Sequence, residues 1–350
     1  MKLSELSPFA LGKAMGKCHC CLKETRRDFC PKCSRKLFGV SDFCATLDYN
    51  ISQLSFSESG AIKRISLSGA QAKFSARMEG KRLVNTDRGG THILKPSLQN
   101  RYDNFQDSPA NEHVTMLMAK SVFKIPTALS ALLFLEDGNP VYVTKRFDVL
   151  ENGERINQSD FAQIAGLVPE KNGSNYKYEG ISYEEIAELI QKYVSAADVA
   201  VEVFFRTVLF NYLVCNGDAH AKNFSLCSTP EAPEVYELTP AYDLLNTSLH
   251  IPNEMSRMAL DLFKDEDDFS TPFYEMNGFY GVPDFMEFAK RIGVVEKRAK
   301  RFIKQAVDSV PIMEAMLDDS FLSDSSKEKY KASVRDRAMA LGVLEDAKMC

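Results

Sequence analysis

Three polar side chains, Asp218, Asn223 and Asp243, lie near one another in the sequence between long apolar stretches. Phosphoryl transfer needs a carboxylate that orients and deprotonates an alcohol, together with oxygen ligands for the Mg²⁺ ion that carries the phosphates. An Asp, an Asn soon after it and a second Asp beyond a short hairpin supply these groups. The alternative is an ordinary polar loop. A zinc-protease motif does not fit, because no Glu lies between paired histidines around His220.

Three upstream features favour the same chemistry. Small residues in SLSGAQ, residues 66–71, allow backbone N–H groups to approach phosphates. Lys95 ends an apolar strand pattern, from which its ammonium group can reach the α- and β-phosphates. Glu112 opens the next predicted helix and can pair with Lys95. Taken singly, the first two features are more typical of an ordinary β-turn and a sheet-edge lysine, and the third is also typical of an acidic residue that favours the helix dipole.

The apolar pattern predicts which elements position these groups. Short alternating segments over residues 60–145, separated by turns at 79–81 and 137–139, predict an antiparallel sheet with one helix that Asn111 caps. Beyond Asp148 the period becomes helical. An almost wholly apolar helix over residues 196–214, capped by Ser195, leads directly to Asp218. A β-rich half followed by a helical half, with polar loops between them, is the layout of a kinase.

The composition is ordinary for a globular protein and suggests two or three structural units. The chain has 350 residues, of which 45% are hydrophobic and 26% charged. A net charge of -5 gives no general attraction to nucleic acid or membrane. No apolar run approaches the roughly 20 residues that span a bilayer, and the first residues do not resemble a signal peptide. We therefore expect a cytoplasmic protein.

Six of the nine cysteines fall within the first 44 residues. Two Cys-x-x-Cys turns, Cys18 to Cys21 and Cys30 to Cys33, predict a closed tetrahedral zinc site of structural type. His19 and Cys20 leave the identity of the ligands open. Free cytosolic thiols, a redox pair and a zinc module that contacts nucleic acid are the alternatives.

The ordered set of motifs resembles the HipA-like serine/threonine kinases, the toxins of bacterial toxin–antitoxin modules. The matching segments are RISLSGAQAKFS, THILKP, NEHVTMLMAK, TKRFD, DAHAKNFS and LTPAYD, which span residues 60–245 in the family's order. The resemblance implies an α+β, two-lobed protein-kinase-like fold. The corresponding units are a cysteine-rich segment over 1–45, a β-rich N-lobe over 46–147 and a helical C-lobe over 148–350.

The resemblance also implies the roles of individual residues. Asp218 is the catalytic base, Asn223 and Asp243 hold Mg²⁺, and Lys95 contacts the ATP phosphates. The hinge binds adenine through its backbone, Asp148 reaches the ribose, and His220 lies near the nucleotide. The full set of implied ATP contacts is Ser68, Gly69, Ala70, Gln71, Lys73, Lys95, Lys145, Arg146, Phe147, Asp148, His220, Asn223 and Asp243.

By resemblance, the SLSGAQ loop carries an autophosphorylated serine that inhibits the enzyme, and Ser66 and Ser68 are both candidates. The S-x-S pattern is similar to that of the shorter, HipT-like members. A phosphate there adds about two negative charges where the ATP phosphates must bind. Autophosphorylation should therefore eject the loop and stop the reaction.

Two departures from the family pattern affect the implied partners. Longer members carry an N-terminal subdomain where this chain has about sixty residues with a zinc knuckle, so a separate small protein is one possible source of it. Lys145 also replaces an acidic hinge residue, which backbone recognition of adenine tolerates. The resemblance implies a DNA-binding antitoxin, contact with DNA only through that antitoxin, and an aminoacyl-tRNA synthetase as substrate. Phosphorylation of this substrate would arrest growth.

Two other functions fit part of the pattern. A related fold can phosphorylate a small alcohol instead of a protein. A regulatory partner can bind a nucleotide without turnover, although such proteins usually lose one of the residues equivalent to Lys95, Asp218, Asn223 and Asp243.

Overall fold

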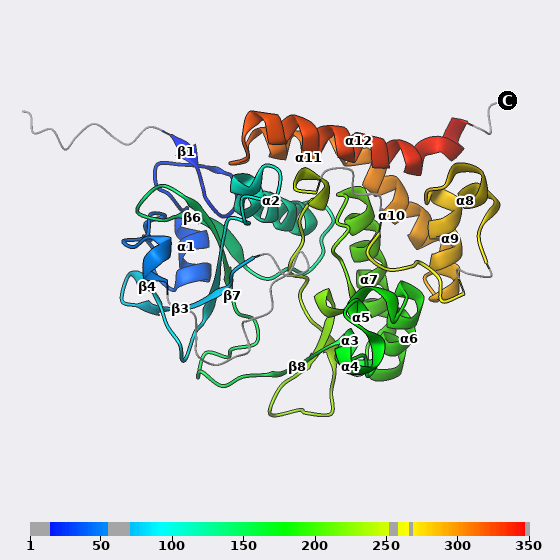
Figure 1. Cartoon of the computed structure of the whole chain (residues 1–350), viewed down its shortest axis with the longest axis horizontal. Coiled ribbons are helices and arrows are strands. Elements are labelled where there is room, and N and C mark those ends of the chain that lie inside the picture. The colour runs from blue at the N-terminus through cyan, green and yellow to red at the C-terminus, as the bar shows by residue number, and fades with distance from the viewer. Residues whose placement is uncertain (1–14, 55–70, 252–257, 266–268, 347–350) are drawn as a thin grey trace, which may run out of the picture.

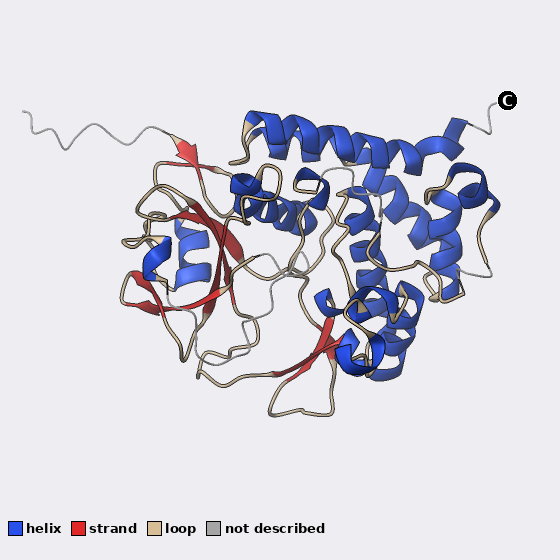
Figure 2. Cartoon of the chain, in the orientation of Figure 1, coloured by secondary structure: helices blue, strands red, loops and turns tan. Residues whose placement is uncertain are grey.

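The computed structural model describes residues 15–54, 71–251, 258–265 and 269–346, without the side chains beyond residue 342. A β-rich N-lobe and a larger helical C-lobe lie side by side (Figures 1 and 2). This arrangement confirms the expected two-lobed α+β fold. The predicted phosphate-loop residues Ser66, Ser68, Gly69 and Ala70 lie outside the described residues.

The N-lobe is built on a five-stranded antiparallel sheet in the order β4-β3-β5-β7-β6. The strands are β3 (Phe74–Glu79), β4 (Arg82–Asn85), β5 (His92–Pro96), β6 (Ser130–Phe134) and β7 (Pro140–Lys145). Gly80 turns the chain between β3 and β4 with φ 62°, a conformation that glycine adopts without a steric penalty. The expected strands over residues 74–145 are confirmed, and β5 places Lys95 in the middle of the sheet.

Each face of this sheet is covered by a different part of the chain. Val141 and Val143 of β7 pack against α1 (Pro31–Phe38) and the segment that follows it, whereas Tyr142 faces the core on the other side. Helix α2 (Ser108–Ser121) covers that second face. Successive side chains of a strand point to opposite faces, so one strand serves two cores.

Two predicted helix caps are wrong. Helix α2 begins at Ser108, with Pro109 in its first turn, so Asn111 lies inside the helix and is fully buried. Proline is favoured at this position because the first N–H groups of a helix have no partner within it. Helix α7 (Ala197–Leu213) begins after Ala196, without a side-chain cap from Ser195.

The C-lobe is organised around α7, whose phenylalanines Phe204, Phe205 and Phe210 are fully buried. Helix α6 (Tyr183–Tyr193) packs beside it, and α9 (Val282–Arg291), α10 (Glu296–Asp308), α11 (Val310–Asp318) and α12 (Asp324–Asp346) complete the lobe (Figure 1). The remaining helices are short: α3 (Phe161–Ile164), α4 (Pro169–Asn172), α5 (Tyr176–Glu179) and α8 (Pro272–Asn277). None of the described helices is both long enough and apolar enough to span a membrane.

A small three-stranded sheet lies where the two lobes meet. Its order is β10-β9-β8, with β8 at Asn157–Asp160, β9 at Ser225–Ser228 and β10 at Glu237–Leu238. The loop that carries Asp218 enters β9, and the segment that carries Asp243 follows β10. This sheet therefore brings the two polar loops together.

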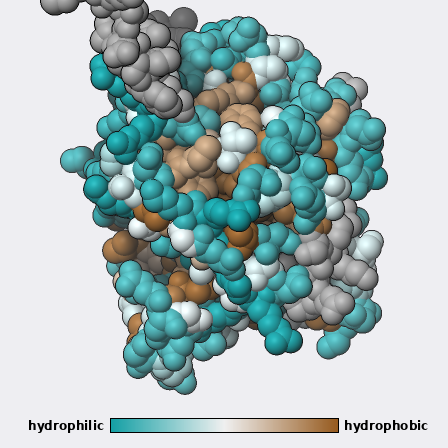
Figure 3. Space-filling model, turned by 90° about the vertical axis from the view of Figure 1, so that its left-hand side faces the viewer, coloured by the Kyte–Doolittle hydropathy of each residue, from teal (hydrophilic) through white to brown (hydrophobic). Residues whose placement is uncertain are grey.

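At the start of the described chain, strands β1 (Gly16–Lys17) and β2 (Glu24–Thr25) form a two-stranded hairpin. The core on the α1 side of the large sheet runs continuously from Cys18 to Leu54 and into the strands. Figure 3 shows the N-lobe end of the molecule, where hydrophobic side chains gather in a hollow with hydrophilic residues around it.

Candidate active site

A pocket opens between the sheet of the N-lobe and the loops of the C-lobe. Its wall is formed by β5, β7, the segment that follows β7, and the loop that carries Asp243. Seven of its lining residues were predicted as nucleotide contacts, namely Lys73, Lys95, Lys145, Arg146, Phe147, Asp148 and Asp243. Gln71 lies nearby and donates to the carbonyl of Pro96 at 2.8 Å.

Lys95 is the centre of a buried ionic cluster in this pocket. Its Nζ lies 2.6 Å from Oε1 of Glu112 and also contacts Oδ1 of Asp243. Nζ of Lys73 lies 3.0 Å from Oδ2 of Asp243. The expected pairing of Lys95 with Glu112 is thus present, and each carboxylate oxygen of Asp243 accepts from a lysine.

The charges of this cluster depend on one another because burial alone would disfavour them. Burial opposes the charged form of Lys95, but the carboxylates of Asp243 and Glu112 outweigh it and raise the pKa of the ammonium group. Burial likewise opposes ionisation of Asp243, but Lys73 and Lys95 hold its pKa well below the usual range. For Glu112, the effect of burial exceeds the attraction of Lys95, so the pKa of its carboxyl group is raised.

Asp243 is held in place by the backbone around it. Its φ is 56°, a left-handed conformation that is uncommon outside glycine. A few residues later, the backbone of Asn246 forms two hydrogen bonds with the side chain of Asn111 on α2, at 2.8 and 3.0 Å. Asn111, predicted as a helix cap, instead ties α2 to the Asp243 segment.

The loop that carries Asp218 is fixed by hydrogen bonds on both sides. Cys215, which follows α7, has φ 54°, and the N–H of Gly217 donates to Oγ1 of Thr247 at 2.9 Å. The hydroxyl of Tyr183 donates to the carbonyl of Ala219 at 2.8 Å. These contacts make the loop a rigid platform for a side chain that must be oriented.

Asp218 is largely buried and contacts an aromatic residue that the sequence did not single out. The hydroxyl of Tyr178, on α5, donates to Oδ1 of Asp218. His220 packs edge-on against Tyr178, with ring centroids 5.0 Å apart, and its Nε2 is 3.9 Å from Oδ1 of Asp218. Burial and the nearby Lys177 lower the pKa of His220 to about 3, so its imidazole is neutral at physiological pH.

The predicted magnesium ligands provide oxygen atoms of the kind that this ion prefers. Oδ1 of Asn223 is buried and has no hydrogen-bond partner among the residues that the structure describes. A buried amide oxygen without a partner is costly unless a ligand satisfies it. Asn223 therefore has an oxygen available to an ion, whereas both carboxylate oxygens of Asp243 are engaged by lysines.

The segment after β7 differs in detail from the expected hinge. The N–H groups of Lys145 and Arg146 already donate to the carbonyls of Leu129 and Thr91, both at 2.8 Å. The guanidinium group of Arg146 pairs with the carboxylate of Asp148, Nε to Oδ1 at 2.9 Å. The N–H groups of Lys145 and Arg146 are therefore engaged within the protein, and the carboxylate of Asp148 is paired with Arg146.

The four expected zinc ligands also come together. The Sγ atoms of Cys18, Cys21, Cys30 and Cys33 all lie within 4.8 Å of one another. Tetrahedral coordination with Zn–S bonds of about 2.3 Å puts the sulfurs about 3.8 Å apart. The N–H of Cys30 donates to Sγ of Cys18 at 3.2 Å, while the ring of His19 contacts the carbonyl of Leu132. The arrangement of these four sulfurs is compatible with the predicted zinc site.

Sequence reasoning missed Tyr178 and several residues that line the pocket between the lobes. The missed lining residues are Ile93, Ala128, Thr144, Gln158 and Tyr242. Thr144 and Tyr242 lie next to predicted residues in the sequence, so their position beside a motif could have indicated them. Tyr178 lies in a polar stretch without periodicity, and only the fold brings it to Asp218.

Known proteins with related sequences match most of this chain. The profile of the HipA-like C-terminal domain matches residues 65–313. Y4mE of Sinorhizobium fredii, which carries a provisional kinase name, is 28% identical over 79% of this chain and 63% of its own length. The serine/threonine-protein kinase toxin HipA of Shewanella oneidensis is 26% identical over 73% of this chain and 59% of its own length. This chain therefore spans about three-fifths of the length of these two relatives.

A solved structure shares the fold. It is the complex of Shewanella oneidensis HipA with HipB and operator DNA, which matches 86% of this chain and 69% of that chain with a TM-score of 0.63 and 20% sequence identity. At this identity the likeness establishes the architecture alone.

Proposed function

The chain belongs to the HipA-like C-terminal domain family, and we propose that it is an ATP- and Mg²⁺-dependent protein serine/threonine kinase. The observation that carries the proposal is the buried Lys95–Glu112 pair, which shares a pocket with Asp243. Protein kinases use such a pair to hold a lysine against the ATP phosphates. A buried ion pair adds little stability by itself, so its presence beside this pocket supports a functional role.

In this mechanism Asp218 orients the hydroxyl of the acceptor and takes its proton. Lys95 and Lys73 leave the carboxylate of Asp243 for the phosphates, which compete for the same ammonium groups. Asn223 and Asp243 would hold Mg²⁺, which when bound neutralises phosphate charge. The protein contributes mainly orientation and preorganised charge, as in other phosphoryl transfers.

The acceptor we propose is a serine or threonine of a cellular protein. By family resemblance it is an aminoacyl-tRNA synthetase, whose modification would halt translation and growth. We further propose that the serines of the SLSGAQ loop, Ser66 and Ser68, are autophosphorylated and inhibit the enzyme through the added charge.

The proposed partners follow from the relatives. HipA of Shewanella oneidensis is known in complex with HipB and operator DNA. We propose that a cognate DNA-binding antitoxin restrains this chain too, and that a small protein supplies the subdomain found in longer members. Contact with DNA would be made through the antitoxin. We place the reaction in the cytoplasm, where these substrates occur.

We also propose that the chain carries one structural Zn²⁺ ion on Cys18, Cys21, Cys30 and Cys33. All four ligands come from the protein, which is typical of a structural site and leaves no position for a substrate.

The test compares the wild type with Asp218→Asn and the control Asp198→Asn, an exposed acid in the first turn of α7. With radiolabelled ATP, the wild type and Asp198→Asn should transfer label to protein. Asp218→Asn should lose about 10²- to 10⁴-fold in rate while still binding ATP. Expression in a bacterial host, followed by phosphoproteomics, should give a growth defect and one dominant phosphosite that both require Asp218.

Each alternative gives a different result. Full activity of Asp218→Asn would refute the role of this residue as the base. Label found only on a metabolite would identify a small-alcohol kinase. ATP binding by the wild type without any turnover would identify a regulatory partner.

A further inference from the structure

The cysteine cluster lies against both lobes, not at the end of the N-lobe alone. The backbone of His19 pairs with β6, where the N–H of Leu132 donates to the His19 carbonyl at 2.9 Å. On the other side, the ring of His19 packs on Phe321 with centroids 4.7 Å apart, and Lys17 pairs with Asp319 at 3.0 Å. Phe321 and Asp319 belong to the connection between α11 and α12. The cluster therefore sits between the sheet and the C-lobe.

Three consecutive residues of α2 contact three different parts of the protein. Asn111 binds the backbone of Asn246 in the segment that follows Asp243, and Glu112 binds Lys95. His113 contacts the carbonyl of Cys20 through its Nε2, at 3.3 Å. Successive residues of a helix point about 100° apart, and all three side chains are almost completely buried. One turn of α2 thus joins the C-lobe loop, the ATP lysine and the cysteine cluster.

His113 contacts the turn that carries two of the predicted metal ligands, Cys18 and Cys21. Cys20 lies inside the Cys18-x-x-Cys21 turn, so the position of its carbonyl depends on the geometry of that turn. Strands β1 and β2 have two residues each, and a hairpin of this size is not stable by itself. A metal that crosslinks the two Cys-x-x-Cys turns would supply the missing rigidity, as in small zinc modules.

We propose that Zn²⁺ bound by the four cysteines braces α2, so that metal occupancy sets the Lys95–Glu112 pairing and with it the kinase activity. The part that concerns activity rests on the proposed function; the part that concerns α2 does not. The metal is thus a remote positioning element, and His113 is the residue that transmits its effect.

The first experiment compares the wild type, Cys21→Ser and the control Cys44→Ser, which alters an exposed thiol outside the cluster. Metal content is measured by mass spectrometry, exchange of the amide hydrogens of residues 108–121 by hydrogen–deuterium exchange, and kinase activity with radiolabelled ATP. We expect one zinc per chain in the wild type and in Cys44→Ser. Cys21→Ser should lose zinc, exchange faster in α2 and lose about 10- to 100-fold in activity, the range for a lost charge-assisted hydrogen bond.

A second variant, His113→Phe, separates the brace from folding of the zinc module. Nδ1 of His113 is buried and has no hydrogen-bond partner among the described residues, so the bond to Cys20 is the hydrogen bond that phenylalanine removes, while an aromatic ring is kept. The variant should keep its zinc and its folded circular dichroism spectrum. It should nevertheless show faster exchange in α2 and reduced activity.

The outcomes separate the two proposals. Unchanged exchange of α2 in a zinc-free Cys21→Ser protein, or in zinc-loaded His113→Phe, would overturn the brace. Absence of zinc from the wild type would also overturn it. If the wild type is inactive but α2 loosens in both variants, the brace stands and the proposed kinase function fails.

Discussion

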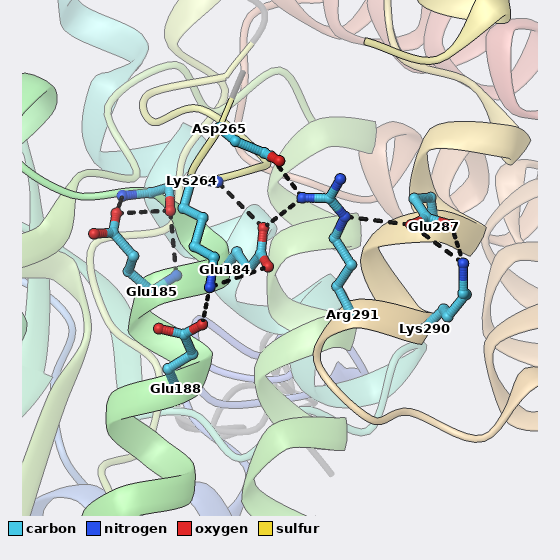
Figure 4. A network of polar contacts seen from close by, with 9 residues as sticks. Glu184, Glu185, Glu188, Lys264, Asp265, Glu287, Lys290 and Arg291 are labelled. Carbon is cyan, nitrogen blue, oxygen red and sulfur yellow. Dashed lines mark hydrogen bonds and ion pairs between the residues drawn. The ribbon is translucent and has the colours of Figure 1, made fainter. Parts of the chain in front are cut away.

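Two ionic networks of similar size lie in different parts of this molecule. The first joins Lys73, Lys95, Glu112 and Asp243 in the pocket between the lobes. The second lies within the C-lobe, where Arg291 bonds Glu184 at 3.1 Å, Asp265 at 2.6 Å and Glu287 at 3.3 Å (Figure 4). Both contain a buried carboxylate, yet their surroundings differ.

The C-lobe network is closed by packing. The guanidinium group of Arg291 lies 4.8 and 4.2 Å from the ring centroids of Phe263 and Phe269, and Lys264 and Lys290 extend the network to the surface. The pocket network instead borders a cavity, and both oxygens of Asp243 bind lysines that face it. A network that must exchange partners needs such a space, whereas one that only joins α6 to α9 does not.

The largest effect should come from Lys95→Met. It removes the ammonium group from two carboxylates, of which Glu112 is fully buried, and breaking a buried pair in this way costs about 3–5 kcal/mol. Activity should also fall, by about 10²- to 10³-fold, because a clamp on the phosphates is lost. Urea unfolding and radiolabel transfer measure the two effects.

The control for Lys95→Met is Asp218→Asn, which should lose activity without a comparable loss of stability. If Lys95→Met were as stable as the wild type, the pocket network would not depend on this lysine for its charge balance.

Arg291→Met should reverse this pattern. It leaves the buried carboxylate of Glu184 with the backbone N–H of Lys264 at 3.2 Å and the Lys264 ammonium group 3.9 Å away, and should cost about 3 kcal/mol of stability. The ATP-dependent rate per folded molecule should stay unchanged. Arg298→Met, which breaks a half-exposed pair with Glu202, should cost less than about 1 kcal/mol. Equal losses in the two variants would refute the distinction between buried and exposed pairs.

Acid should weaken the N-lobe beside the pocket. Burial lowers the pKa of His92, on β5, to about 4. Between this value and the unfolded value of about 6.5, the unfolded state binds the proton, so stability present above pH 6.5 is lost as the pH falls. From pH 7 to pH 5 the loss from His92 is about 2 kcal/mol.

The measurement is urea unfolding of the wild type and His92→Gln over this pH range. The difference in stability between the two proteins should be largest at pH 7 and shrink toward pH 5. A constant difference across the range would show that His92 is not held neutral by its burial.

The sequence predicted best where chemistry and periodicity coincide. Lys95 and Glu112 form the pair that the kinase-like layout suggested, and the four cysteines found from their spacing lie together. The caps at Asn111 and Ser195 were wrong, because a favourable residue type does not decide which of several neighbouring residues begins a helix. At Asn111 tertiary bonding to Asn246 takes the side chain instead.

The C-lobe network and Tyr178 could not be predicted. Glu184 and Arg291 are far apart in the sequence, and each is a charged residue of the kind usually found on the exposed face of a helix. Only the fold, which brings these residues of α6 and α9 within 3.1 Å of each other, reveals the pair. The same holds for α2, whose three consecutive polar residues have three distant partners. Long-range polar contacts leave no periodic signal.

The smallest effect should come from Tyr178→Phe. The Tyr178 hydroxyl donates to Oδ1 of Asp218, the proposed base, where it would compete with an acceptor hydroxyl. Removing one such hydrogen bond, worth roughly 1 kcal/mol, should raise kcat/KM for the protein substrate by about fivefold, with the KM for ATP unchanged. Tyr176→Phe, whose hydroxyl lies 3.5 Å from Nζ of Lys222, is the matched control and should leave kcat/KM unchanged. A fall in kcat/KM for Tyr178→Phe would mean that the phenol orients the base instead of competing with the substrate, and Asp218 would then belong to a closed network like that of Arg291.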